Sequence, residues 1–196
     1  MRGFGNTSPG TTGLAMLACA CAVLLPACSS GPAFYDDPSA IAVLDATQNN
    51  PVHGVVTFVR VKDKDLAQVN VNMAGFRPST AHGLHIHEYG DCTARDAASA
   101  GAHFNPGAAD HGGPDGGPLH AGDLGNVVAD DRGNVYASLK VPGIAFGSGG
   151  DSIVGRAIVV HAVADGYKTR PAGNSGARLA CGTITRNADR RAYSPS

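Results

Sequence analysis

The sequence predicts an all-β fold, an eight-stranded sandwich or barrel with two long functional loops. Short runs that are rich in β-branched residues or alternate in polarity follow one another, separated by Gly, Pro, Asp and Asn. This pattern is typical of strands joined by turns. No segment carries a convincing helical period. Many short strands without helices indicate a sandwich or a barrel.

Eight strands are expected, four in each half of the domain. Those of the first half are residues 41–46, 54–61, 67–73 and 83–87. Those of the second half are residues 126–129, 134–141, 156–162 and 179–185. Two connections are too long for simple hairpins, namely residues 88–125 and residues 163–177. Long loops in compact domains often carry function, so we expect functional residues there.

The start of the chain has the features of a targeting segment. Its apolar run, residues 13–25, is too short to span a bilayer but long enough for the core of a signal peptide. The run ends in Leu25-Pro26-Ala27-Cys28, which resembles the lipobox of bacterial lipoproteins, whose cysteine is lipidated and becomes the new N-terminus. The alternative is ordinary signal cleavage nearby, which leaves Cys28 free. In both cases we expect the protein to leave the cytoplasm.

This interpretation divides the chain into four parts. They are a signal peptide at residues 1–27, a lipidated tether at 28–40, a folded domain at 41–186 and a polar tail at 187–196. The tether is small, polar and contains Pro, as expected of a flexible link. We expect a lipid-anchored protein on the periplasmic or cell-envelope side of a bacterial membrane. Because the net charge is −1 and the basic residues are scattered, we expect no nucleic-acid partner.

The five cysteines divide between the leader and the domain. Cys19 and Cys21 lie in the expected signal peptide, and Cys28 would carry lipid. Cys92 and Cys181 are the two that remain in the domain. Two thiols in an oxidising compartment predict one disulfide.

Seven of the eight histidines lie between residues 82 and 161. His85 and His87 are two residues apart on an expected strand, so both side chains point to the same face, as a metal chelate requires. Further histidines follow in the strings HFNP, HGGP, HAGDLG and VVH. Six histidines and an aspartate exceed what one metal needs and indicate two metals. The chain has no HExxH pattern of a zinc protease and no nucleophile beside a lone histidine, as acyl transfer would require.

Six segments carry a more specific resemblance. They are GLHIHEYGD, HFNP, DHGGP, HAGDLGNV, VVHAVAD and NSGARLACG, and they resemble the signature segments of the copper/zinc superoxide dismutase family in order and spacing. The resemblance covers residues 41–185 and implies a Greek-key barrel of the exported bacterial type. It implies conversion of superoxide to oxygen and hydrogen peroxide, with copper as the redox cofactor and zinc as its structural partner.

The resemblance also implies a role for each site residue. The implied copper ligands are His85, His87, His103 and His161. The implied zinc ligands are His103, His111, His120 and Asp123. His103 then bridges both metals and takes part in catalysis, Asp165 links a copper-bound to a zinc-bound histidine, and Arg178 is the active-site arginine.

Other residues and functions remain as alternatives. The resemblance gives His82 a supporting role through hydrogen bonds, and we interpret His53 as a surface histidine. Lys168 and Arg170 in the second long connection are interpreted as ordinary solvated charges, with attraction of anions as the alternative. The main alternative function is that of a periplasmic copper-binding or copper-delivery protein on the same fold. Such a protein would not need Arg178, so the presence of Arg178 favours the enzyme. A zinc hydrolase would need an open zinc position, which four protein ligands close. Whether the protein is a monomer or a homodimer stays open.

Overall fold

The computed structural model describes residues 1–3, 5, 39–61, 64–114 and 116–187. Nearly all of the expected signal peptide, the tether with Cys28 and the polar tail fall outside these residues. Among the described residues, no helix is long and apolar enough to cross a bilayer.

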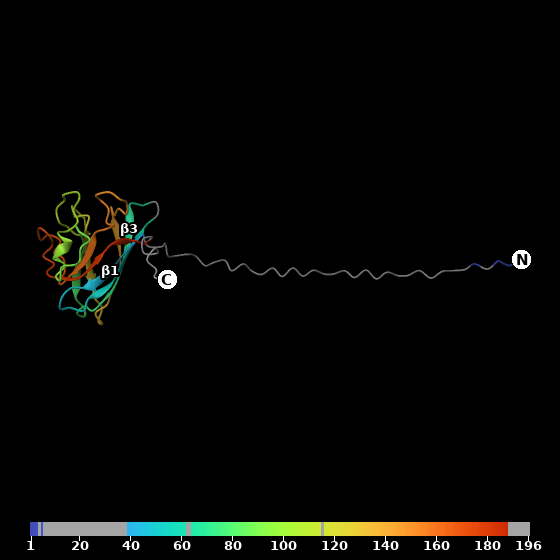
Figure 1. The fold of residues 1–196 in the computed structure, drawn as a ribbon, viewed down its shortest axis with the longest axis horizontal. Coiled ribbons are helices and arrows are strands. Elements are labelled where there is room, and N and C mark those ends of the chain that lie inside the picture. Colours follow the sequence, from blue (N-terminus) through green and yellow to red (C-terminus); the bar gives the residue numbers. More distant parts are fainter. Residues whose placement is uncertain (4, 6–38, 62–63, 115, 188–196) are drawn as a thin grey trace. The chain divides into compact units, whose positions relative to one another are not determined.

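The domain is built from antiparallel strands (Figure 1). They are β1 (Ala40–Ala46), β2 (His53–Arg60), β3 (Leu66–Ala74), β4 (Ala81–His87), β5 (Asp123–Val128), β6 (Val135–Pro142), β7 (Ala157–His161), β8 (Arg178–Thr183) and β9 (Thr185–Arg186). Between β1 and β9, within the described residues, the only helical element is the three-residue 3₁₀ turn η1 (Ala98–Ala100). The all-β prediction is therefore confirmed. The bounds of β1 to β8 differ from the predicted ones by at most three residues.

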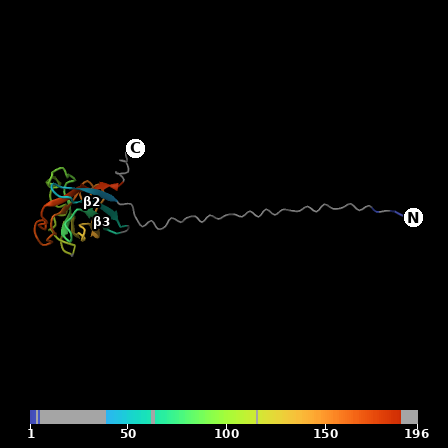
Figure 2. The same ribbon diagram turned by 90° about the horizontal axis from the view of Figure 1, so that it is seen from below.

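The strands form one sheet in the order β5-β4-β7-β8-β1-β2-β3-β6, and β9 pairs with β1. Neighbours such as β3 and β6, or β1 and β8, are not consecutive in the chain, which is the mark of Greek-key connections. The two ends of this order, β5 and β6, come close to each other, so the sheet nearly closes into a barrel (Figures 1 and 2). Eight strands leave an interior that side chains alone can fill.

Alternation along each strand sends apolar side chains into this interior. On β3, Ala67, Val69, Val71 and Met73 are buried, and the residues between them are less buried or exposed. The side chain of Phe58 on β2 is fully buried in the same core. The period of two in the sequence therefore predicts which side chains form the core.

Strand β4 is buried on both faces. Its inward residues Leu84 and Ile86 belong to the apolar core. His85 and His87 alternate with them and therefore point outward, yet they are 0% and 1% exposed. The first loop (residues 88–122) and the second loop (residues 162–177) cover this outer face, since His103 of the first loop pairs with His87 and Asp165 of the second loop contacts His85. The fold thus creates a buried polar layer between the barrel wall and its two long loops.

Strand β5 begins at Asp123, three residues before its predicted start. Asp123 pairs with His85, after a shift of register between Gly83 and His85. The prediction was wrong here because Asp123 and Gly125 are residues typical of a turn. The correction places Asp123 directly beside the histidines of β4.

Candidate metal centre

Six histidines and one aspartate converge on the outer face of the barrel. Two sets of four residues each bring their ligand atoms within 4.8 Å of one another. The first set is His85, His87, His103 and His161. The second set is His103, His111, His120 and Asp123. All seven residues are buried, and His103 belongs to both sets.

Adjacent strands and the first loop position the first set. His85 and His87 lie on β4, and His161 ends the neighbouring antiparallel strand β7. His103 lies in the first loop, where its backbone forms an isolated bridge with His87. Gly122 accepts a hydrogen bond from the Ile86 amide at 2.9 Å, and a Cβ at Gly122 would collide with the Ile86 carbonyl oxygen. The loop can therefore run close against β4 only with glycine at this position.

Hydrogen bonds define which ring nitrogens are free in the first set. Nδ1 of His87 donates to the carbonyl of Gly101 at 3.0 Å, and Nδ1 of His161 donates to that of Gly176 at 3.3 Å. Both Nε2 atoms therefore carry lone pairs, and they lie 3.3 Å apart. His85 uses Nε2 for a carboxylate, which leaves its buried Nδ1 without a hydrogen-bond partner among the described residues.

Burial keeps these rings neutral. It lowers the pKa of His87 to about 2 and that of His161 to about 3, because a charged imidazolium would lose its hydration there. Neutral imidazole nitrogens are good ligands for copper. His85, His87 and His161 therefore fit a copper ion in both protonation and direction.

The second set surrounds the carboxylate of Asp123. Its oxygens lie 2.9 Å from Nδ1 of His103, 2.9 Å from Nδ1 of His111 and 3.2 Å from Nδ1 of His120. The contacts to His111 and His120 do not have hydrogen-bond geometry, and both Nδ1 atoms are buried. Four ligand atoms around zinc at 2.0 to 2.1 Å would lie about 3.3 Å apart in a tetrahedron. The second set therefore fits zinc.

The carboxylate of Asp165 connects the two sets. It accepts hydrogen bonds from Nε2 of His85 at 3.0 Å and from Nε2 of His111 at 2.8 Å. Burial alone would raise the pKa of Asp165, but these two hydrogen bonds lower it below its usual value. Because each of the two rings donates through Nε2, each turns its free Nδ1 toward its own set.

Asn126 is a supporting residue that sequence reasoning missed. Its side chain accepts a hydrogen bond from the Asp165 amide at 2.6 Å and donates one to the Asp165 carbonyl at 3.1 Å. A signal was present, because Asn126 is a polar residue at the start of an apolar run within the string HAGDLGNV. It holds the second loop at the residue that joins the two sets.

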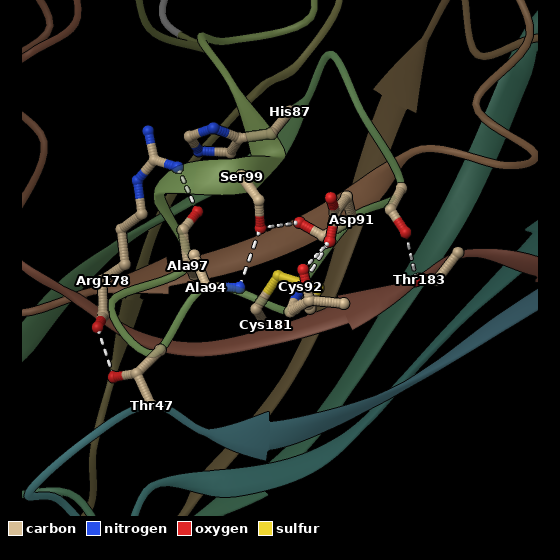
Figure 3. Close-up of a disulfide and its surroundings, with 12 residues drawn as sticks. Thr47, His87, Asp91, Cys92, Ala94, Ala97, Ser99, Arg178, Cys181 and Thr183 are labelled. Carbon is tan, nitrogen blue, oxygen red and sulfur yellow. Dashed lines mark hydrogen bonds between the residues drawn. A yellow bond between two sulfur atoms is a disulfide. The ribbon is translucent and has the colours of Figure 1, made fainter.

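Arg178 lies at the start of β8, beside the first set. Its guanidinium donates to the carbonyl of Ala97 at 2.5 Å (Figure 3). It also donates to the carbonyl of Gly101 at 2.6 Å. The Gly101 carbonyl also accepts the Nδ1 proton of His87. One backbone oxygen therefore fixes the arginine relative to a ring of the first set.

The predicted disulfide between Cys92 and Cys181 is confirmed (Figure 3). It joins the first loop to β8, three residues after Arg178. The loop is braced further by Ser99, whose hydroxyl donates to the Asp91 carbonyl and accepts from the Ala94 amide. The disulfide thus holds the segment whose carbonyls position Arg178.

An open pocket lies over the first set. His87, His103, His161 and Arg178 line it, together with residues of the second loop. His85 does not line this pocket, since it is 0% exposed. Three rings of the first set and the side chains of Arg170 and Arg178 thus line a pocket that is open to solvent.

Two other histidines lie outside both sets. Nδ1 of His82 donates to the carbonyl of His161 at 2.8 Å, and its Nε2 lies 2.7 Å from the Thr80 hydroxyl. His53 is exposed and contacts the Pro51 carbonyl through Nδ1. His82 therefore supports the end of β7 through its hydrogen bond to His161, whereas His53 has no contact with either set.

Comparisons with known proteins agree with this geometry. The family model described as copper/zinc superoxide dismutase (SODC) matches residues 52–184. The chain is 42% identical over 152 residues to the Cu-Zn superoxide dismutase of Paramecium bursaria Chlorella virus 1, which covers 74% of this chain and 77% of that one. It is 38% identical over 151 residues to the Cu-Zn superoxide dismutase of Humicola lutea, covering 74% and 96% respectively.

A solved structure shares the fold. The crystal structure of the clock protein EA4 matches with a TM-score of 0.68 and 40% identity, and the match covers 78% of this chain and 97% of that one. Sequence, fold and site geometry lead to one conclusion. The chain belongs to the copper/zinc superoxide dismutase family.

Proposed function

We propose that the two histidine sets form one bridged two-metal site in this superoxide dismutase. The enzyme converts superoxide to oxygen and hydrogen peroxide, with copper and zinc as its cofactors. The proposed copper ligands are His85, His87, His103 and His161. The proposed zinc ligands are His103, His111, His120 and Asp123. The observation that carries the proposal is that His103 offers a ligand atom to both sets.

When bound, copper supplies the one-electron exchange that turns two superoxide anions into one oxygen and one peroxide. An imidazole between two cations loses its second proton far more readily than a free ring. His103 can therefore release a proton from Nε2 and take one up again at the same atom. One of the two protons that peroxide needs then comes from this atom, and the other comes from solvent through the open pocket. Asp123 keeps the His103 ring oriented through its contact with Nδ1.

Arg178 binds and orients the anion in this proposal. A guanidinium has five N–H donors, and two of its nitrogens donate to the loop carbonyls of Ala97 and Gly101. The remaining donors are available to an anion in the pocket that Arg178 lines. Burial lowers the pKa of Arg178, but an arginine stays charged at physiological pH.

The test is superoxide decay measured together with copper and zinc content on the purified protein. We expect one copper and one zinc per chain, and we expect His161→Ala to lose copper and activity together. His53→Ala is the matched control, since it removes an exposed histidine outside both sets. A wild-type protein that binds copper but does not consume superoxide would instead support a copper-delivery function.

We also propose that residues 1–27 are a signal peptide, that residues 28–40 are a tether and that Cys28 carries a lipid. The enzyme would then lie on the periplasmic or cell-envelope side of a bacterial membrane, as in exported lipoproteins. The support is the apolar run that ends in Leu25-Pro26-Ala27-Cys28. The disulfide between Cys92 and Cys181 also fits an oxidising compartment.

Replacement of Cys28 tests the anchor. We expect Cys28→Ala to release the protein from the membrane fraction without changing its specific activity, because Cys28 lies outside the folded domain. Cys92→Ser with Cys181→Ser should leave the protein in the membrane fraction. A soluble wild-type protein whose mature N-terminus is not Cys28 would rule the anchor out.

A further inference from the structure

A second cation lies at the rim of the proposed copper pocket. Arg170, in the second loop, lines this pocket together with Arg178. Nη1 of Arg170 forms an ion pair with Oδ1 of Asp110, the residue before His111 in the first loop. The two paired side chains are 59% and 58% exposed, so the pair lies at the surface. Arg170 is thus a solvated charge, as the sequence interpretation had it, but one that is paired with a carboxylate.

The two arginines of the pocket differ in how their charge is compensated. Arg178 is held by neutral carbonyls and, in the described part of the chain, forms no ion pair. Arg170 is in direct contact with a carboxylate. At a distance, a cation and an anion in contact act as a dipole, whose field falls off faster than that of a single charge. The pair therefore contributes little attraction for an anion in solution.

The second loop has its own internal support near Arg170. The Gly173 amide donates to the Thr169 carbonyl at 2.7 Å, and the Gly166 amide donates to the Gly173 carbonyl at 2.8 Å. These hydrogen bonds close the loop on both sides of Arg170 without the ion pair. An exposed ion pair also adds little to stability in general. Stabilisation is therefore a poor explanation for the position of Asp110.

We propose that Asp110 masks the charge of Arg170 at the rim of the copper pocket and so sets how strongly the pocket attracts superoxide. The inference rests on the proposed copper site, because the charge of Arg170 can affect the reaction only if copper binds in the pocket that Arg170 lines. Charges that line a cleft focus the field on a small anion and change its association rate, and superoxide dismutase is itself a standard example of such steering.

Masking predicts opposite effects for the two halves of the pair. Asp110→Asn should free the Arg170 charge and speed the reaction. Arg170→Gln should leave an unpaired carboxylate near the pocket and slow it. The double variant should react at close to the wild-type rate. A pair that only fastened the two loops together would give changes of the same sign in both single variants.

The experiment measures the rate constant for superoxide decay by the copper- and zinc-loaded full chain over a range of ionic strength. We expect a change of about two- to fivefold in each direction at low salt, a small part of a whole steering field of about 10- to 1000-fold. The difference should fade as the Debye length shrinks from about 30 Å at 0.01 M to about 3 Å at 1 M. Copper and zinc content is measured in every variant.

Two variants provide matched charge changes away from the pocket. Lys140→Gln removes a cation from β6, and Asp131→Asn removes an anion from the turn between β5 and β6. Both side chains are exposed, and neither lines the pocket. We expect both to react within about 1.5-fold of wild type, since neither charge lines the cleft that focuses the field on the anion.

The outcomes separate the two proposals. Single variants that both match wild type, or that both slow the reaction, would overturn the masking, as would a rate difference that does not change with salt. In those cases the copper site itself would still stand if His161→Ala loses copper and activity. Retention of copper and activity by His161→Ala would instead overturn the proposed copper site.

Discussion

The Nε2 atoms of His87 and His161 lie 3.3 Å apart, although each ring donates from Nδ1 to a backbone carbonyl. Two lone pairs repel at this distance. Protonation cannot relieve the repulsion near neutral pH, because burial lowers the pKa of His87 to about 2 and that of His161 to about 3. A cation bound between the two nitrogens removes the repulsion, and this is why we place copper there.

The metal-free protein should lose stability as the pH falls below about 6.5. An unfolded histidine takes up a proton near pH 6.5, whereas folded His87 and His161 titrate at about 2 and 3. Between these values the unfolded chain binds more protons, so acid favours unfolding. The stability due to neutral rings is complete above pH 6.5 and is lost as the pH falls toward 3.

Urea unfolding with a chelator at pH 7.5, 6.5 and 5.5 measures this dependence. His53→Ala, which changes an exposed ring, is the control and should unfold with the same pH dependence as wild type. Free energies of unfolding that stay level or rise on acidification would contradict neutral, buried imidazoles in the site.

Asp123→Ala should empty the zinc set first. The carboxylate is the shared contact of His103, His111 and His120, so its removal takes away both a ligand and the group that orients the others. Copper should remain bound but with a broadened electron paramagnetic resonance spectrum. Elemental analysis checks the metals, with Asp131→Ala as a control at an exposed aspartate. A variant that keeps zinc, or a wild-type protein with copper only, would contradict the bridged site.

Arg178→Ala should slow superoxide decay by about 10- to 100-fold at low ionic strength. One charge close to the anion in a partly open pocket contributes about 1 to 3 kcal/mol, and about 1.4 kcal/mol corresponds to one decade of rate. Arg178→Lys should recover part of the loss, because the charge survives but the planar fork does not. The measurement is the rate constant at several salt concentrations with copper content matched. An alanine variant as fast as wild type would remove Arg178 from the mechanism.

Cys92→Ser combined with Cys181→Ser should destabilise the domain and slow catalysis. The bond closes a segment with a sequence separation of 89, which corresponds to about 4 to 5 kcal/mol as an upper value in the chain-entropy description. Catalysis should slow because the first loop would hold the carbonyls of Ala97 and Gly101 less firmly against Arg178. Urea unfolding and superoxide decay on the same samples check both effects. Equal stability of the variant and wild type would refute the role of the bond.

The strands could be predicted because their apolar side chains alternate with the period of the pleat. Phe58 and Val56 point inward at a spacing that the printed sequence already shows. The start of β5 could not be predicted, because Asp123 pairs with His85 through a contact across the sheet. Local composition does not record such a pairing.

The motifs predicted which side chains would gather in the site, because the chemistry of a metal site depends on residue types, and His, Asp and Arg can be recognised in the sequence. The carbonyls of Ala97 and Gly101 could not be predicted, because every residue has a carbonyl and only the fold brings these two to Arg178. The pair of Asp110 and Arg170 joins two loops that lie far apart in the chain. Its partners follow from tertiary structure alone.

The central claim is that one imidazole, His103, lies between two different metals. Anomalous diffraction at the copper and zinc edges, from crystals of the protein loaded with both, tests it most directly. We expect a copper peak beside Nδ1 of His85 and Nε2 of His161, a zinc peak beside Oδ1 of Asp123, and the His103 ring between the two peaks. A single peak, or a copper peak without contact to His103, would contradict the account.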